Sequence, residues 1–153
     1  MAYKPTRSMK EALEIANIMA GSYNYIFGYK EYMNPVTKSR IEELARQNPA
    51  TFTQSYIEKS HKFIGKNAID CSGLICECLG ISVIGSYSIC DLPTHYPKIY
   101  SYVAMGERMS GDILWKKGHV GLCKDKNNII EARSINAGVN VFKFTSQNWE
   151  KCI

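Results

Sequence analysis

The stretch DILWKKGHVGLCKDKNNIIEAR, residues 112–133, decides the fold class of this chain. It consists of short runs in which apolar and polar residues alternate, and the runs are separated by Gly, Asp and Asn. Alternation of this kind is typical of β-strands, and the separating residues favour turns. A further run of the same type, VNVFKF, follows at residues 139–144. We therefore expect an antiparallel strand meander from residue 112 onward.

The chain before this stretch carries signals of helices. Two capping-box patterns, in which a Ser precedes a Glu by three positions, mark helix starts at Ser8 and Ser39. Apolar residues at helical spacing follow the first of them. The predicted helices run from Ser8 to Gly21, from Ser39 to a stop before Pro49, over residues 52–63, and over residues 71–79 with Gly80 as the C-terminal stop. Residues 86–110 contain two prolines and no sustained period, so we expect a long irregular connection there.

Helices that come first and an antiparallel sheet that follows indicate an α+β fold, with the N-terminal helices packed on the C-terminal sheet. Neither a βαβ alternation nor a Gly-rich phosphate loop is present in the sequence. The length of 153 residues, with 45% hydrophobic and 22% charged residues, is sufficient for one buried core. We expect a single domain over residues 1–153.

The charge of the chain narrows its possible partners. A formal net charge of +5 favours a polyanionic surface such as nucleic acid, anionic lipid headgroups or a phosphate-bearing bacterial wall polymer. The basic residues are scattered, with no run longer than Lys116 and Lys117, and no RNA-binding or finger motif accompanies them. A nucleic-acid partner is therefore not expected.

Two further features bear on the compartment and on bound metals. Charges at Lys10, Glu11 and Glu14 interrupt the N-terminal apolar runs before they reach the length of a signal peptide or a membrane span. We expect synthesis in the cytoplasm without a signal peptide, and no stable membrane insertion. The six cysteines are expected to be mostly reduced. Cys76 and Cys78 form a C-x-C and not the C-x-x-C of a zinc ribbon, so neither a metal nor a cofactor is expected.

The segment AIDCSGLICECLG, residues 68–80, places Cys71 at the start of a predicted helix. A lone Cys in such a place is more often a packing residue. The unpaired N–H groups and the positive end of the helix dipole nevertheless stabilise a thiolate, which predicts a lowered pKa for Cys71 and a nucleophilic role. A nucleophilic Cys needs a base, and His is suited to that task.

Three histidines are available as the base. His61 lies on the polar side of a predicted helix and His95 lies in the proline-containing connection, whereas His119 opens a strand directly after Gly118. His119 is therefore the best placed. A base of this type needs a third group to orient its ring, and Glu131 lies on the next strand. As an alternative, Glu131 is a structural carboxylate that pairs with a neighbouring cation.

One register of the hairpin brings these residues together. If the hairpin centres on Lys126, Gly121 lies opposite Glu131, His119 lies opposite Arg133, and all four side-chain positions share one face. The same register gathers an apolar set on the other face, consisting of Val120, Leu122, Ile130 and Ala132. A slip of one residue would destroy both groupings. The pattern predicts an odd-length or bulged connection at this turn.

These motifs together resemble the NlpC-type cell-wall cysteine peptidases, which have a papain-like core. DCSGL at residues 70–74, and GDILW with GHVGLCKDKNNIIEA within residues 111–132, are similar to the nucleophile and base motifs of that family. YIFG at residues 25–28 is similar to its Y-x-W-G element, with Phe27 in place of Trp. Residues 29–53 and 129–144 resemble a branch common in phages and prophages of Gram-positive bacteria.

The resemblance implies a papain-like NlpC-type fold and a catalytic triad. By position, Cys71 becomes the nucleophile and His119 the general base and acid. Glu131 takes the ring-orienting place that a second His fills in many members.

Three further residues acquire expected roles from the same resemblance. Tyr25 is expected near the oxyanion, where it would assist the backbone N–H of Cys71; its alternative is a core aromatic. Asp70 and Ser72 flank the nucleophile and are expected to contact a substrate amine. The other five cysteines and the two tryptophans are expected in packing roles, with Trp115 close enough to His119 in sequence to line the cleft.

The expected function is that of a peptidoglycan hydrolase, an endopeptidase that cleaves stem peptides after γ-D-glutamate through a thioester. The resemblance implies an endolysin-like or virion-associated enzyme that acts at the bacterial cell wall, and we expect a monomer. An N-acetylmuramoyl-L-alanine amidase is an alternative, because the same thiolate chemistry serves either amide. A catalytically silent module of the same fold, which binds the wall or builds the virion, is a second alternative.

Overall fold

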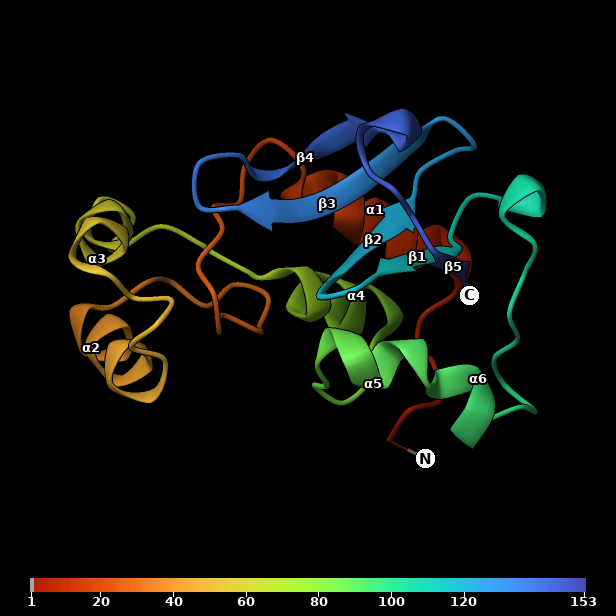
Figure 1. The fold of residues 1–153 in the computed structure, drawn as a ribbon, viewed down its shortest axis with the longest axis horizontal. Coiled ribbons are helices and arrows are strands. Elements are labelled where there is room, and N and C mark those ends of the chain that lie inside the picture. The colour runs from red at the N-terminus through yellow and green to blue at the C-terminus, as the bar shows by residue number, and fades with distance from the viewer. Residues whose placement is uncertain (1) are drawn as a thin grey trace.

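The computed structural model describes residues 2–153 and confirms the predicted order, with helices first and an antiparallel sheet after them (Figure 1). The helices are α1 (Met9–Met19), α2 (Lys38–Gln47), α3 (Gln54–His61), α4 (Cys71–Leu79), α5 (Ser86–Cys90) and α6 (Leu92–His95). Two short 3-10 turns are η1 (Met105–Glu107) and η2 (Phe144–Ser146). The strands are β1 (Ile113–Lys116), β2 (His119–Cys123), β3 (Asn128–Ser134), β4 (Gly138–Lys143) and β5 (Lys151–Cys152).

Two of the predicted helices have the expected limits and caps. Helix α1 begins after Ser8, whose side chain accepts from the backbone N–H of Glu11 at 3.1 Å, while the Glu11 carboxylate accepts from the Ser8 N–H at 3.0 Å. This reciprocal pair is the predicted capping box. Helix α4 spans the predicted residues and ends at Gly80, whose φ of 67° lies in the left-handed region. The helix that carries Cys71 is therefore delimited by its own sequence.

The start of α2 differs from the prediction. Its cap is Thr37 and not Ser39, and the Thr37 hydroxyl accepts from the N–H of Arg40 at 3.2 Å. The reason lies just upstream, where Val36 pairs with the segment around residues 64–67 and holds the chain extended up to Thr37. The chain is then free to turn into a helix at Lys38, which places Ser39 inside the first turn.

Two other predicted limits also need correction. Helix α3 is shorter than residues 52–63, because Thr53 caps it and Phe52 is buried in the core before it begins. Residues 86–110 are not wholly irregular, since they contain α5, α6 and η1. These pieces are only three to five residues long, too short to display a helical period in the sequence.

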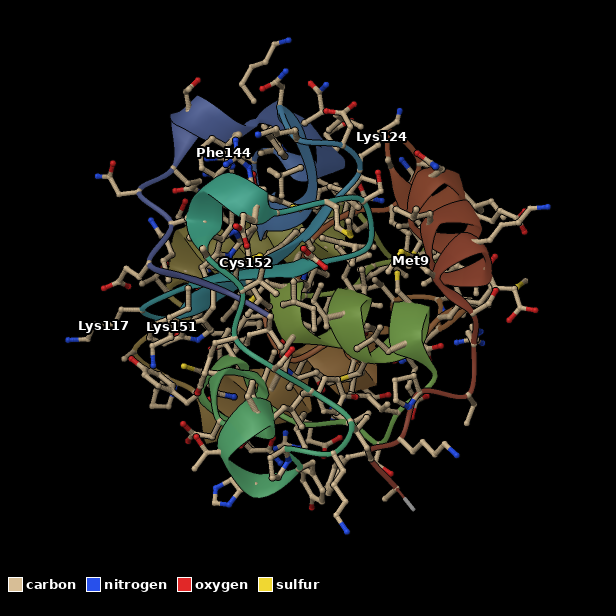
Figure 2. The ribbon with its side chains drawn as sticks, turned by 90° about the vertical axis from the view of Figure 1, so that its right-hand side faces the viewer. Met9, Lys117, Lys124, Phe144, Lys151 and Cys152 are labelled. Atoms are coloured by element: carbon tan, nitrogen blue, oxygen red, sulfur yellow. The ribbon has the colours of Figure 1, made fainter. Side chains whose placement is uncertain are left out.

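The sheet has the order β4-β3-β2-β1-β5, and every neighbouring pair is antiparallel. Leu122 pairs with Ile130 and Cys123 with Ile129, which confirms the register centred on Lys126. The last strand, β5, was not predicted. It is two residues long and pairs Cys152 with Leu114 at the edge of β1 (Figure 2).

The turn between β2 and β3 has the predicted odd length. The N–H of Lys124 donates to the carbonyl of Asn128 at 2.9 Å, which leaves three residues at the tip. The Asp125 carboxylate accepts from the N–H groups of Asn127 and Asn128, both at 2.9 Å. This local side-chain cap fixes the turn, and with it the residues that face each other across the hairpin.

Helices α1 and α4 pack on one face of the sheet and form the main core with it. This core contains the predicted apolar set, namely Val120, Leu122, Ile130 and Ala132. A second cluster lies on the opposite face, where Leu114, Cys123, Ile129 and Cys152 are covered by Trp149 and its neighbours. A third cluster joins α2 and α3 to the segment before them. The five cysteines other than Cys71 are buried and unbridged, as expected of packing residues.

No helix within residues 2–153 has the length and hydropathy needed to cross a membrane. Within the same residues, no three His, Cys, Asp or Glu side chains gather in a way that could hold a metal ion.

Candidate active site

Cys71 is the first residue of α4 and lines a surface cleft of about 370 Å³. The residue before it, Asp70, caps the helix by accepting from the backbone N–H of Gly73 at 2.9 Å. This cap satisfies one of the free N–H groups of the first turn and fixes where the sulfur emerges. The other residues that line the cleft are Tyr25, Phe27, Lys30, Asp70, Ser72, Gly85, Ser86, Tyr87, Ser88 and Gly118.

The thiol of Cys71 does not have the lowered pKa that its helix position predicts. Burial and the negative charge of Asp70 raise the pKa of Cys71 to about 11. A hydrogen bond from the backbone N–H of Val120 and the nearby Lys30 ammonium act in the opposite direction, but they do not offset the burial. The physical reason is that the sulfur is largely withdrawn from water, which penalises the charged form. The Cys71 side chain is therefore a neutral thiol near pH 7.

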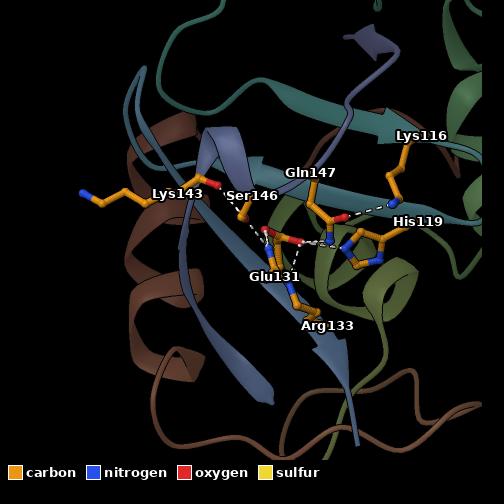
Figure 3. Close-up of polar contacts among 7 residues, drawn as sticks. All are labelled: Lys116, His119, Glu131, Arg133, Lys143, Ser146 and Gln147. Carbon is orange, nitrogen blue, oxygen red and sulfur yellow. Dashed lines mark hydrogen bonds and ion pairs between the residues drawn. The ribbon is translucent and has the colours of Figure 1, made fainter. Parts of the chain in front are cut away.

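His119 and Glu131 face each other from β2 and β3, as the register requires (Figure 3). Nε2 of His119 lies 2.8 Å from Oε1 of Glu131, whose side chain is 0% exposed. Glu131 also accepts from Arg133, with 2.9 Å between Nη2 and Oε2, and from the Gln147 amide at 3.1 Å. The two interpretations of Glu131 are thus compatible, because one carboxylate orients the imidazole and pairs with a cation.

These partners keep Glu131 ionised. Burial on its own raises the pKa of a carboxyl group, but the hydrogen bonds from His119, Arg133 and Gln147 outweigh it and hold the pKa of Glu131 below its ordinary value. An ionised carboxylate accepts hydrogen bonds only, so the Nε2 of His119 is the nitrogen that carries a proton. The other ring nitrogen, Nδ1, is then free to act as a base when the ring is neutral.

The Cys71 thiol contacts the start of β2 next to the residue that carries the imidazole. The backbone N–H that donates to Cys71 belongs to Val120, the residue directly after His119. Among residues 2–153 the hydrogen bonds do not include one between the Cys71 thiol and the His119 ring. Catalytic hydrogen bonds are often longer in a resting enzyme and shorten when substrate binds.

Two residues that the sequence did not indicate complete the surroundings of the imidazole. Gln147 bridges Glu131 and Lys116, since its amide donates to Glu131 and its carbonyl accepts from Lys116 Nζ at 2.8 Å (Figure 3). The ring of Trp149 stacks on His119 with a centroid distance of 5.6 Å and an interplanar angle of 19°. Both come from the irregular segment after β4, which has no pattern that would place it over β2.

Trp115 has the packing role that the sequence predicts, but it does not line the cleft. Trp115 is buried and donates from Nε1 to the carbonyl of Ser86 at 3.0 Å, so it packs in the core beneath the cleft wall. Trp149 is the one that contacts His119. Gly121 makes room for this arrangement, because a Cβ there would lie 3.0 Å from Cγ of Glu131 and 3.1 Å from the Trp149 ring.

The other predicted residues lie in the same cleft or far from it. Tyr25 lines the cleft with Cys71, and burial together with Cys71 raises the pKa of the Tyr25 hydroxyl, which therefore keeps its proton. Asp70 and Ser72 are both buried, and both contact the Lys30 ammonium, which the sequence did not single out. His61 and His95 are exposed at the ends of α3 and α6, outside the cleft.

Comparisons with known proteins agree with this architecture. No family model and no curated protein sequence matches the chain. Solved structures do match it, among them the following two. The NlpC/p60 domain of the peptidoglycan hydrolase SagA is 15% identical with a TM-score of 0.58, and the match covers 96% of this chain and 98% of that one. NlpC2 from Trichomonas vaginalis is 12% identical with a TM-score of 0.56, and the match covers 94% of this chain and 43% of that one.

The chain therefore has the fold of an NlpC/p60 domain, which confirms the predicted fold. It spans less than half the length of the Trichomonas protein. At these identities the likeness establishes the fold, and the chemistry of the cleft has to be argued from its own residues.

Proposed function

We propose that this protein is a cysteine peptidase that hydrolyses an amide bond in the stem peptides of bacterial peptidoglycan. The observation that carries the proposal is that the helix-terminal thiol of Cys71 accepts a hydrogen bond from the residue next to His119, whose imidazole a buried carboxylate orients. These residues come from three different elements, so their grouping depends on the fold. The SagA domain, whose printed description is that of a peptidoglycan hydrolase, supports the choice of substrate.

The chemistry follows from the protonation states at rest. Nδ1 of His119 removes the proton from the Cys71 thiol as the sulfur attacks the carbonyl carbon. The tetrahedral intermediate collapses when the imidazolium gives that proton to the leaving amine, which departs and leaves a thioester on Cys71. Water, deprotonated by the same imidazole, then attacks the thioester and releases the acid and the free thiol. Glu131 stays ionised throughout and stabilises the imidazolium.

Negative charge on the carbonyl oxygen needs fixed donors. The backbone N–H of Cys71 is one of the first N–H groups of α4, which have no partner within the helix. The protonated hydroxyl of Tyr25 lines the same cleft. We assign these two groups to the oxyanion, in agreement with the role that the resemblance implies for Tyr25.

The remaining features of the proposal rest on the family resemblance and on charge. The scissile bond is the one after γ-D-glutamate, and the net charge of +5 suits an anionic wall. Residues 1–153 form one NlpC-type domain, which acts at the cell wall as a monomer in an endolysin-like or virion-associated enzyme.

Digestion of purified sacculi tests the proposal. The wild type is expected to release soluble muropeptides, and Cys71→Ala and His119→Ala are each expected to abolish the release. His95→Ala is the matched control, because His95 is exposed and outside the cleft. Mass spectrometry of the products separates an endopeptidase from an N-acetylmuramoyl-L-alanine amidase by the new termini. A wild type that releases nothing would identify a silent module of the same fold.

A further inference from the structure

Lys30 occupies the polar corner of the cleft next to the nucleophile. Its Nζ lies 2.5 Å from Oδ2 of Asp70 and donates to the hydroxyl of Ser72 at 2.7 Å. The side chain of Asp70 is 3% exposed, whereas that of Lys30 is 29% exposed and lines the cleft. The charged group that a substrate meets at this corner is therefore an ammonium and not a carboxylate.

All hydrogen-bond acceptor sites of the Asp70 carboxylate are occupied by donors from the protein. Oδ1 accepts from the N–H of Gly73 at 2.9 Å and from the hydroxyl of Ser72 at 3.3 Å. Oδ2 accepts from the N–H of Gly28 at 3.0 Å and from the Lys30 ammonium. A carboxylate offers about four lone-pair sites, and four donors fill them here. A substrate amine would find no free acceptor on Asp70.

The position of Lys30 is fixed by the backbone as well as by its side chain. A Cβ on Gly73 would lie only 2.8 Å from Cα of Lys30, so the chain at Lys30 packs directly on the first turn of α4. The N–H of Asp70 also donates to the carbonyl of Tyr29 at 2.7 Å. Withdrawing the ammonium would leave the buried Asp70 carboxylate without its charge partner, which is costly.

We propose that Lys30 is a specificity-determining residue, which makes the cleft reject peptides with a free N-terminal amine on the acyl side of the scissile bond. The ammonium of a free peptide N-terminus at this corner would be repelled by the positive charge of Lys30. It would also find no free hydrogen-bond acceptor on Asp70. An ammonium has three N–H donors and two of those on Lys30 are engaged, so one remains for a carbonyl oxygen. The cleft then favours peptides whose N-terminal nitrogen is acylated.

This inference rests on the proposed function and specifies its substrates. Stem peptides that are still attached to glycan have an acylated first nitrogen, whereas peptides already released from glycan have a free amine. The preferred substrates are then intact muropeptides, and the expected order of events is cleavage of the stem before any release of the peptide from the glycan. This assigns Asp70 and Ser72 to holding Lys30 and not to binding a substrate amine.

Two synthetic stem peptides of the same sequence, one with an N-acetyl group and one with a free N-terminus, test the inference. With the wild type, kcat/KM for the acetylated peptide is expected to be at least about tenfold higher. Lys30→Met and Lys30→Gln are each expected to reduce that ratio toward one through a gain on the free-amine peptide. Lys30→Gln keeps an N–H donor for Asp70, so it provides a test if Lys30→Met fails to fold.

Lys66→Met, which removes an exposed lysine outside the cleft, is expected to keep the wild-type ratio. Equal kcat/KM for the two peptides in the wild type overturns the inference and leaves the proposed function intact. Digestion of sacculi without cleavage of the acetylated peptide also overturns the inference. A wild type that digests neither sacculi nor peptides overturns the proposed function and the inference with it.

Discussion

Nε2 of His119 and Oε1 of Glu131 lie 2.8 Å apart across the β2–β3 hairpin, and this contact sets the tautomer of the imidazole. Replacement of the carboxylate by an amide, Glu131→Gln, removes the charge that holds the proton on Nε2. We expect kcat/KM on sacculi or stem peptides to fall by about a hundredfold or more, with KM little changed. Glu42→Gln, on the exposed side of α2, is the control and is expected to leave both constants unchanged.

The lowered pKa of Glu131 also predicts how stability depends on pH. A carboxyl whose pKa is lower in the folded protein than in the unfolded chain adds stability above its ordinary pKa of 4.5, and this stability is lost as the pH falls through the folded value. Urea unfolding from about pH 7 down to about pH 3 is expected to show this loss in the wild type, and a flatter profile in Glu131→Gln. Parallel profiles of the two proteins would contradict the assignment.

The raised pKa of Cys71 makes a prediction about thiol reactivity. With a pKa of about 11, only about one thiol in 10⁴ is ionised at pH 7, and the thiolate is the reactive form. Alkylation of Cys71 by iodoacetamide, followed by mass spectrometry of its tryptic peptide, is expected to accelerate about tenfold for each pH unit between pH 7 and pH 10. A rate that is independent of pH in this range would indicate a thiolate–imidazolium pair already formed at rest.

A side chain at Gly121 is expected to disturb both the packing of the sheet and the position of Glu131. A Cβ at this position would lie 2.8 Å from Cγ2 of Ile129, closer than real Cβ contacts, and close to Glu131 and Trp149 as well. Gly121→Ala is expected to lower the free energy of unfolding by about 1–3 kcal/mol and to reduce kcat by displacing Glu131. Gly106→Ala, where a Cβ meets nothing within 4 Å, is the control and is expected to change stability by less than about 0.5 kcal/mol.

The corrected start of α2 can be tested by a pair of substitutions. Thr37→Ala removes the side chain that caps the helix and is expected to cost about 1 kcal/mol of stability. Ser39→Ala lies inside the first turn and is expected to be neutral within about 0.5 kcal/mol. Chemical denaturation of both variants measures the difference. An equal or larger loss in Ser39→Ala would restore the capping box predicted from the sequence.

The sequence was most informative where short-range pattern and long-range packing agree. The alternation around Lys126 sorts apolar from polar residues in only one register, so the placement of His119 next to Glu131 followed from the pattern alone. The C-terminal limit of α4 followed from the stop at Gly80, whereas the cap residue Asp70 was recognised only in the structure.

The sequence was uninformative where a contact depends on segments without periodicity. Gln147 and Trp149 reach the imidazole from an irregular segment, and Lys30 reaches Asp70 from a loop. The predicted lowering of the Cys71 pKa was wrong for a related reason. Burial of the sulfur, which raises the pKa, depends on the assembled cleft and not on the helix terminus.

Helix α4 is held at both of its ends by segments far away in the sequence. Asp70 is tied to Gly28 and Lys30 at one end, while Thr6 and Arg7 donate to the last carbonyls of the helix at the other. A protease that nicks the chain between Arg7 and Ser8 would cut this second tether without touching the cleft. Cys71 would then lie on a helix whose C-terminal end had lost these hydrogen bonds, so such a nick is expected to reduce the activity on sacculi without any change in the cleft itself.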